Sequence, residues 1–403
     1  MVFYWGNKIR KKMSKMIHGP VRHPIHHYLP LEAIGRFLSK NIVMVIAFLA
    51  ALVTCFIIPV DRAYLDYFDV KTLTCLFCVL AVVCALKNIN FFYILAQKII
   101  VSCGNIRLSI LVLVYITFIG SMLIANDMAL LTFLPLGYFV LSTTGESRHM
   151  AFTFIMQNIA ANLGGMLTPF GNPQNLYLYT KFQIPTGEFM GIMAIPFVLA
   201  VALITVCCLV FVKPEELKIR QAPAALPKGR AVLYLALFTL AIAIVFRGIP
   251  YWIGLIVIPA VLLFADRKAL KMVDYPLLLT FVFFFIFAGN MARIEGVRKL
   301  FSFLLEKNTL IFSTVSCQFI SNVPSAILLS QFTENYRDLL IGVNIGGVGT
   351  LIASLASLIT FREYTNHAPQ KSRQYILLFS AFNFAFLIIL TAIMLALKAF
   401  GIG

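Results

Sequence analysis

The chain has 403 residues, of which 61% are hydrophobic and 12% charged, and its mean hydropathy is +0.91. This composition excludes a soluble globular domain and predicts a polytopic membrane protein, because several apolar runs are long enough to cross a bilayer. The formal net charge of +17 does not indicate nucleic acid as a partner, since Lys and Arg gather at the edges of apolar runs, as they do in cytoplasmic loops.

Residues 1–41 are predicted to form a basic cytoplasmic tail without a cleavable signal peptide. Four histidines of this tail could hold a metal ion, but no Cys or acidic residue lies among them, so a solvated tail is favoured and no metal site is expected. Cys75 and Cys78 form a C-x-x-C pattern inside an apolar run, where helix packing is a simpler interpretation than redox chemistry. The histidines are His18, His23, His26 and His27.

The rest of the chain is predicted to be an all-α polytopic membrane domain with about nine crossings and two helical hairpins. Each hairpin, 108–141 and 309–333, is an apolar stretch interrupted near its middle by small or polar residues, and each returns the chain to the side it left. The crossings are expected at 42–60, 70–86, 149–181, 187–212, 231–246, 249–265, 275–290, 335–361 and 374–399.

Counting crossings from a cytoplasmic N-terminus gives a topology that follows the positive-inside rule almost throughout. The loop 61–69 falls outside, and the basic linker 213–230 falls inside. The exception is an outside segment, 296–307, whose separate polar and apolar faces predict an amphipathic helix in the membrane interface. A weaker, inverted counterpart of this helix is expected at 90–103.

Two segments carry the pattern Asn-x-Gly-Gly-x-x-Thr inside long hydrophobic runs: NLGGMLTPFGN at 162–172 and NIGGVGTLIAS at 344–354. These residues stop a helix, so 149–181 and 335–361 are expected to be broken membrane helices. Aligning the two segments pairs Asn162 with Asn344, Thr168 with Thr350, Asn172 with Ser354 and Asn175 with Ser357.

Each broken helix follows a hairpin that carries an Asn at its tip, Asn126 in LIANDMALLTFLP and Asn322 in FISNVPSAILLS. Hairpin, broken helix and last crossing therefore recur in the same order, and the parity count gives the two copies opposite orientations. A single Gly-Gly is more often a packing contact, but this recurrence predicts two inverted repeats, 42–212 and 249–399, joined through the crossing 231–246.

Broken membrane helices leave backbone N–H and C=O groups that protein, water or a ligand must satisfy, and in secondary transporters these groups form the binding site. The N-termini of half-helices suit an anion, and free carbonyl groups suit Na⁺. We therefore expect hairpin tips and helix breaks to bind a small anionic solute. The candidate residues are Asn126, Asp127, Thr168, Asn172, Asn175, Ser321, Asn322, Thr350 and Ser354.

The segment GGMLTPFGNPQN (164–175) resembles the G-G-x-x-T-x-x-G-[TSDN]-P-x-N motif of the ion transporter superfamily, which includes arsenite permeases, Na⁺/H⁺ antiporters, citrate transporters and divalent anion/Na⁺ symporters. The likeness covers 42–399, and the first tip is more similar to the arsenite and antiporter branch. The resemblance implies that the tip Asn residues and the facing breaks hold substrate and coupling ion. These roles fall on Asn126 and Asn322, with Gly171, Asn172, Ala353 and Ser354 opposite them.

The chain departs from the symporter pattern where hydroxyl residues are usual. Ala125, Asp127 and Val323 replace Ser or Thr at the tips, and SLAS (354–357) replaces Thr-Pro-Pro-Asn. The sequence therefore leaves the coupling ion and the substrate open.

Asp127 is the only charged residue between Arg107 and Glu146 and the one acidic group that we place deep in the membrane. A carboxylate there costs at least about 2.5–3.5 kcal/mol on insertion scales, which marks a functional residue by default. The alternative is a capping residue at the start of the second hairpin limb. Cation binding and release could make Asp127 lose and regain a proton, so we expect coupling to H⁺ or Na⁺ through this side chain.

These features predict a secondary active transporter of a small carboxylate or oxyanion, coupled to Na⁺ or H⁺ and working by an elevator-like movement. A Na⁺/H⁺ antiporter or arsenite efflux permease is the leading alternative, and a channel is less favoured. An enzyme is disfavoured, because NIGGVGT lacks the Lys-[ST] of a phosphate-binding loop and no acid, base and nucleophile gather. We expect a multi-pass plasma-membrane protein, such as one of a bacterial inner membrane, with no cofactor apart from Na⁺ as a coupling ion, and leave a homodimer open.

Overall fold

The computed structural model describes residues 41–101, 103–216 and 226–401. Residues 1–45 form a unit of their own, and the fold described below is that of the second unit, 46–403. The predicted basic tail with its histidines and the middle of the central linker, 217–225, lie outside the described residues. Regular structure in the described part of the chain is helical, without strands, which confirms the all-α expectation.

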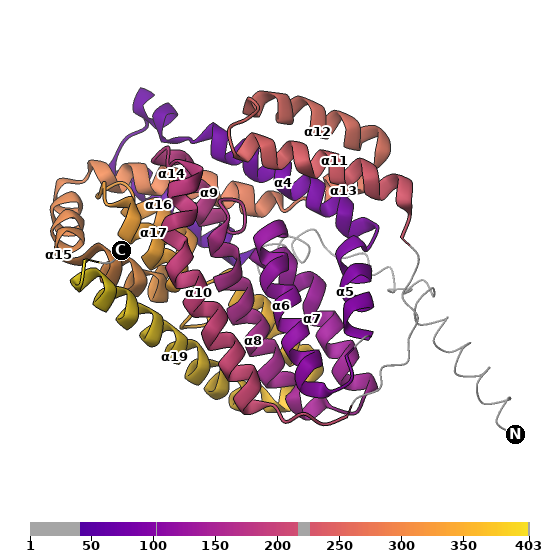
Figure 1. Ribbon diagram of the computed structural model, residues 1–403. Helices are drawn as coiled ribbons and strands as arrows, with labels where there is room; N and C mark the ends of the chain where they lie inside the picture. The colour runs from indigo at the N-terminus through magenta and orange to yellow at the C-terminus, as the bar shows by residue number, and fades with distance from the viewer. Residues whose placement is uncertain (1–40, 102, 217–225, 402–403) are drawn as a thin grey trace, which may run out of the picture. The chain divides into compact units, whose positions relative to one another are not determined.

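Figure 1 shows the helices in chain order, from indigo to yellow. Apolar runs form most of them, and the ends fall at Asp, Asn, Pro and Gly residues that cap or interrupt a helix. The helices are α3 Ile42–Ile57, α4 Val70–Asn88, α5 Phe91–Val101, α6 Ile106–Ile124, α7 Asn126–Thr143, α8 Met150–Gly164, α9 Pro173–Lys181, α10 Thr186–Phe211, α11 Lys228–Val245, α12 Tyr251–Ala265, α13 Arg267–Met272, α14 Tyr275–Arg293, α15 Glu295–Ile320, α16 Asn322–Leu329, α17 Tyr336–Ile345, α18 Leu355–His367 and α19 Ser372–Ala399, with a 3₁₀ turn η1 at Arg62–Tyr67.

Six helical segments of the described chain are long and apolar enough to cross a membrane, judged by length and composition. They confirm the prediction of a polytopic membrane protein. Two other predicted crossings, α3 and α12, form helices of only 16 and 15 residues. Such a helix is about 23 Å long, which is less than the roughly 30 Å of a hydrocarbon core, so flanking residues or local thinning of the bilayer must make up the difference.

The two stretches predicted as hairpins each form a pair of helices that turn at a single residue with a positive φ angle. In the first, α6 and α7 meet at Ala125, with φ 66° and ψ 152°. In the second, α15 and α16 meet at Ser321, with φ 72° and ψ 159°. Non-glycine residues rarely adopt this conformation, so its occurrence at both tips indicates that the surrounding contacts impose the same turn.

The first limb of the second hairpin is continuous with the predicted amphipathic segment. Both lie in α15, which is kinked at Asn308, where φ is −163° and ψ is 94°. The Oδ1 atom of Asn308 accepts a hydrogen bond of 2.9 Å from the amide of Ile311, so this side chain caps the limb. Asn105 does the same at the start of α6, through a 2.8 Å bond from the amide of Leu108.

The two predicted breaks are present as interruptions between α8 and α9 and between α17 and α18. Asn172 and Ser354 occupy the N-cap positions of the second halves, α9 and α18, in extended conformations. Glycine is required where the first halves end: a Cβ atom on Gly164 would lie 2.3 Å from the carbonyl oxygen of Phe118, and one on Gly346 would lie 2.8 Å from Cys317. The close approach binds each broken helix to the first limb of its own hairpin.

The second limb of each hairpin packs against the second half-helix of the other half of the chain. The limb α7 packs against α18, and the limb α16 packs against α9. A further group is formed by α4 with α11, α12 and α13, which lie together along one side in Figure 1, and α4 also contacts α9 of the first break. The free thiols of Cys75 and Cys78 are buried in α4, inside this group.

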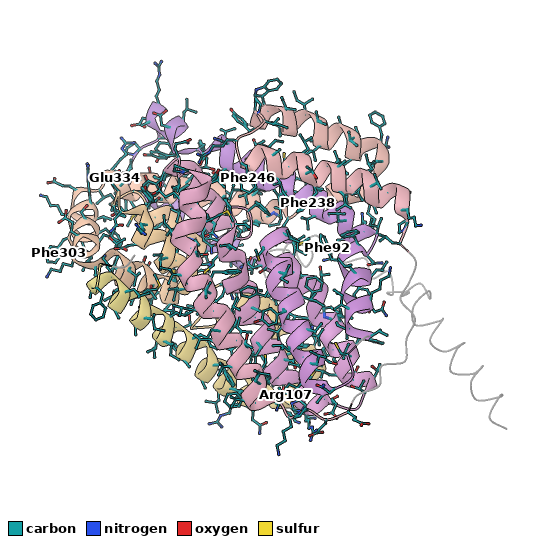
Figure 2. The ribbon with its side chains drawn as sticks, in the orientation of Figure 1. Phe92, Arg107, Phe238, Phe246, Phe303 and Glu334 are labelled. Atoms are coloured by element: carbon teal, nitrogen blue, oxygen red, sulfur yellow. The ribbon has the colours of Figure 1, made fainter. Side chains whose placement is uncertain are left out.

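Polar contacts at the helix ends and in the connecting segments join parts of the chain that are distant in the sequence. Figure 2 shows Arg107 near one end of the helices and Glu334 toward the other end. The contacts are Arg293 to Asp61 at 2.7 Å, Tyr336 to Glu188 at 2.7 Å, Asn88 to Asp266 at 3.0 Å, Arg148 to Glu215, and Lys398 to Asp338.

Candidate substrate and ion site

The hairpin tips are held against the helix breaks by the two threonines of the repeated pattern. The hydroxyl of Thr168 donates a 2.7 Å hydrogen bond to the carbonyl of Met122, four residues before Asn126. The hydroxyl of Thr350 donates a 3.0 Å bond to the carbonyl of Gln318, four residues before Asn322. Because both carbonyls lie in the last turn of a limb, where no helical partner follows, these bonds satisfy the backbone at the tips.

The side chains of the two tip asparagines make matching hydrogen bonds. The Oδ1 atom of each accepts a 2.9 Å bond from the next amide in the chain, Asp127 in one case and Val323 in the other. The amide side chain of Asn126 reaches Asn162 of the first break at 3.4 Å, and the backbone N–H of Asn322 donates to the carbonyl of Ala353 at 2.9 Å. Ser321 donates to the same carbonyl at 3.2 Å.

The two breaks meet directly through buried amide side chains. Asn172 donates to Asn344 at 3.2 Å, and Asn344 donates to Asn175 at 2.6 Å. Asn172 also donates to the carbonyl of Asn162 at 3.2 Å, while its Oδ1 atom has no hydrogen-bond partner among the described residues. Helix halves from distant parts of the chain thus share one polar centre that contains an unused acceptor.

A cavity of about 60 Å³ lies beside the first tip, between α4 and the N-termini of α7, α9, α14 and α18. Most of its lining is apolar, and its two ionisable groups are Asp127 and Asp274. The Oδ1 atom of Asp127 is buried and has no hydrogen-bond partner in the described chain. The remaining lining residues are Leu76, Val79, Leu80, Ala125, Met128, Leu131, Phe170, Pro173, Leu176, Leu277, Leu355 and Ile359.

Helix N-termini give this cavity a partial positive potential, whereas the two carboxylates give it negative charge. The arrangement therefore suits a cation or proton held at Asp127, and an anion only when that charge is compensated. Asp127 lies in the first turn of α7, but it bonds to no backbone amide there, so a capping role receives no support from its contacts.

The structure brings the predicted residues into one region but uses them differently. Asp127 lines the cavity. Phe170, Pro173 and Leu355 line it too, and they are the sequence neighbours of the predicted residues Gly171, Asn172 and Ser354. Asn175 binds the backbone of its own break, at Gly165 and Met166, and Ser354 caps α18 through the amide of Ser357. The residues whose side chains or carbonyls make structural bonds in this region are Thr168, Asn175, Ser321, Asn322, Thr350, Ala353 and Ser354.

Three residues of the region were not among the predicted site residues. Asn162 and Asn344 were noticed only as members of the repeated pattern, although their pairing was the signal that could have singled them out. Asp274 gave no such signal, because an Asp just before an apolar run is the usual N-cap of a helix, and it does cap α14 through the amide of Leu277.

Comparison with known proteins identifies the family of this chain. A family model described as citrate transporter, CitMHS, matches residues 32–335. The chain is 34% identical to the uncharacterized transporter MJ0456 of Methanocaldococcus jannaschii over 294 residues, which cover 72% of this chain and 80% of that protein. It is 29% identical to the inner membrane protein YbiR of Escherichia coli over 284 residues, covering 68% and 74%. The chain therefore belongs to the CitMHS citrate-transporter family, within the ion transporter permeases that its helix-break motif resembles.

Proposed function

We propose that the protein is a secondary active transporter that moves a small carboxylate or oxyanion across the membrane, coupled to H⁺ or Na⁺. One observation carries this proposal: two hairpin tips and two helix breaks, taken from separate halves of the chain, converge on one buried polar centre. Interrupted helices at such a centre are the usual means by which transporters bind a solute away from both solutions.

The repeat relation is supported by contacts that occur twice at matching positions. Both tips turn with nearly the same backbone angles, and both tip asparagines accept a bond from the following amide. Both threonines bond to the carbonyl four residues before a tip asparagine. Unrelated segments would have no reason to repeat these details, so internal duplication is the simplest explanation.

An inverted orientation of the repeats is supported by the polar contacts between connecting segments. Asp61 and Arg293 both lie outside in the topology counted from the sequence, and so do Glu188 and Tyr336. Arg148 and Glu215 both lie inside. A topology with one crossing too many or too few would put such partners on opposite sides of the membrane.

An elevator-like movement is our proposal for how the site reaches both sides. The tips, breaks and their helices pack on one another, whereas α4 packs mainly with α11, α12 and α13 and meets the other group at α9 and at the cavity of Asp127. The amphipathic first part of α15 leads into its hairpin through the kink at Asn308, and α5 precedes the first hairpin, whose first limb is capped by Asn105. Such arms can connect a fixed group of helices to one that moves.

A second function has a specific observation in its favour. The cavity next to the first tip holds two carboxylates and little other polar surface, which suits exchange of Na⁺ for H⁺ better than binding of a bare anion. A Na⁺/H⁺ antiporter or an arsenite efflux permease therefore remains the alternative.

Reconstituted protein separates these functions. Vesicles preloaded with unlabelled citrate or phosphate should take up the labelled solute by saturable exchange if the anion proposal is correct. A Na⁺/H⁺ antiporter predicts no exchange with these solutes, but a Na⁺-dependent pH change inside the vesicles, and an arsenite efflux permease predicts exchange of arsenite alone. Uptake that rises linearly with concentration and shows no exchange would indicate a channel instead.

A further inference from the structure

A second cavity, of about 150 Å³, lies between the end of α4, the start of α5 and the second limb α7. Its lining combines one cation with three uncharged polar residues and a few apolar side chains. The cation is Lys87, in the last turn of α4, and the polar residues are Asn90, Tyr93 and Thr132. The remaining lining residues are Phe92, Leu131 and Pro135, and Phe92 is labelled in Figure 2.

Lys87 is half-buried, and no described residue forms an ion pair or hydrogen bond with its ammonium group, although its backbone carbonyl accepts from the amide of Asn90 at 2.9 Å. The carboxylate that its sequence neighbour Asn88 contacts at 3.0 Å, Asp266, is also engaged by Tyr234 at 3.2 Å and by the amide of Ala269 at 3.1 Å. A half-buried ammonium group without a partner is costly, and a small anion would neutralise it.

The two cavities follow one face of α7. Asp127, Leu131 and Pro135 are spaced four residues apart, which places them on the same side of the helix. Asp127 and Leu131 line the cavity at the tip, and Leu131 and Pro135 line the one with Lys87. The path from Asp127 to Pro135 is about 12 Å long, and Leu131 separates its two ends.

We propose that the Lys87 cavity is a binding site for small oxyanions or carboxylates at the cytoplasmic entrance of the transport path. Its role as an entrance rests on the proposed transport function, and its side follows from the topology in which α4 ends inside. Lys87 supplies the charge, while Asn90 and Tyr93 supply hydrogen-bond donors; the hydroxyl of Thr132, which lines the same cavity, donates to the carbonyl of Met128 at 2.8 Å. Leu131 divides this site from the carboxylate-lined cavity, so the anion does not face Asp127 until the path opens.

The test uses full-length protein carrying Thr132→Cys, reconstituted in phosphatidylcholine vesicles. We compare the rates at which a sulfonate-bearing and a trimethylammonium-bearing methanethiosulfonate modify this cysteine, with the unsubstituted chain as the baseline for the native thiols. The charge of Lys87 lines the same cavity as Thr132 and acts with opposite sign on the two reagents. In water, a unit charge at about 6 Å changes two such opposed rates about tenfold relative to each other, so Lys87→Gln should lower the ratio of the sulfonate rate to the trimethylammonium rate by about that factor. Lys87→Arg should keep the ratio.

Lys268→Gln is the matched control, because Lys268 is an exposed cation of α13 that lies outside the cavity. It should leave the ratio unchanged. Citrate or inorganic phosphate should slow the sulfonate reagent in the Lys87 protein and not in Lys87→Gln. The reagents should reach the cysteine from the cytoplasmic side of oriented vesicles.

Three results would overturn the proposal: a ratio that Lys87→Gln leaves unchanged, no modification of Thr132→Cys in protein that elutes as the wild type does, or protection that requires anionic phospholipid in the vesicles. The last result would assign the cavity to a lipid headgroup. Modification of the cysteine by the reagents does not depend on accumulation of a solute. If gradient-driven uptake fails while the rates still depend on Lys87, the proposed transport function is rejected and the anion site is retained.

Discussion

Asn344→Leu tests whether the two helix breaks form one functional centre. This side chain of α17 accepts a hydrogen bond from Asn172 at 3.2 Å and donates one to Asn175 at 2.6 Å, and it is 1% exposed. Leu has a similar volume, so the substitution removes these bonds without opening a large cavity. An amide hydrogen of Asn172 and the Oδ1 atom of Asn175 then lose their shared partner.

The expected size of the effect follows from these two buried groups. In soluble proteins each unsatisfied group costs about 1–3 kcal/mol, which gives about 2–6 kcal/mol for both. Within membranes the measured hydrogen bonds average only about 0.6 kcal/mol, because the unfolded state finds other partners there. We therefore expect a loss of about 1–3 kcal/mol, seen as a lower midpoint of thermal unfolding in detergent.

The same variant should bind solute more weakly, since Asn172 and Asn175 would no longer be held in place across the site. The matched control is Asn290→Leu, which removes a buried amide of α14 that bonds to Thr54 at 3.2 Å, away from the breaks. It should lower the unfolding midpoint and leave the KM of exchange unchanged. If folded Asn344→Leu has the wild-type KM, the two breaks do not form a shared binding centre.

Further predictions concern the tips, the movement and the connecting segments. Asn126→Ala and Asn322→Ala should each weaken solute binding by about 1–3 kcal/mol, as measured by calorimetry; wild-type affinity in both would place the site elsewhere. Leu131→Cys on α7 should crosslink with Leu80→Cys on α4, which lines the same cavity, and in a second, exclusive state with Leu73→Cys, about 10 Å away along α4; a single pattern unaffected by solute would contradict an elevator. Arg293 holds the pKa of Asp61 below its ordinary value through their hydrogen-bonded ion pair, so this pair stabilises the fold above about pH 4 and loses its effect as pH falls further. The unfolding midpoint of wild-type protein should then exceed that of Asp61→Asn at pH 7 and approach it in acid, whereas a constant difference would show that the pair contributes nothing through charge.

Local sequence signals were sufficient to predict the helices and the positions of their interruptions. Apolar runs indicated the crossings, and Gly-Gly followed by Asn-Pro or Ser indicated the breaks, because glycine and proline act on the backbone at their own positions. The tips were predicted from a single Asn in each hairpin. None of these conclusions required knowledge of which helices touch.

The contacts across the site could not be predicted in this way. That Asn344 lies against Asn172 and Asn175 depends on how two distant halves dock, and no periodicity within either half encodes their distance. Asp274 resembled an ordinary helix cap, and only the packing of α14 against other helices, α4 among them, brings it to the cavity of Asp127. The kink at Asn308, which joins the amphipathic arm to the hairpin limb, was likewise hidden in a continuous helical pattern.

We propose that an ion or proton held at Asp127 drives solute transport, and the variant Asp127→Asn tests this coupling. The amide has nearly the same shape but neither ionises nor carries a charge. In proteoliposomes the wild-type protein should concentrate the exchanged anion when a pH or Na⁺ gradient is imposed. The variant should still exchange labelled for unlabelled anion at equal concentrations and should fail to accumulate it under either gradient. Accumulation by Asp127→Asn against a concentration gradient, at the wild-type level, would contradict the account and assign coupling to other groups.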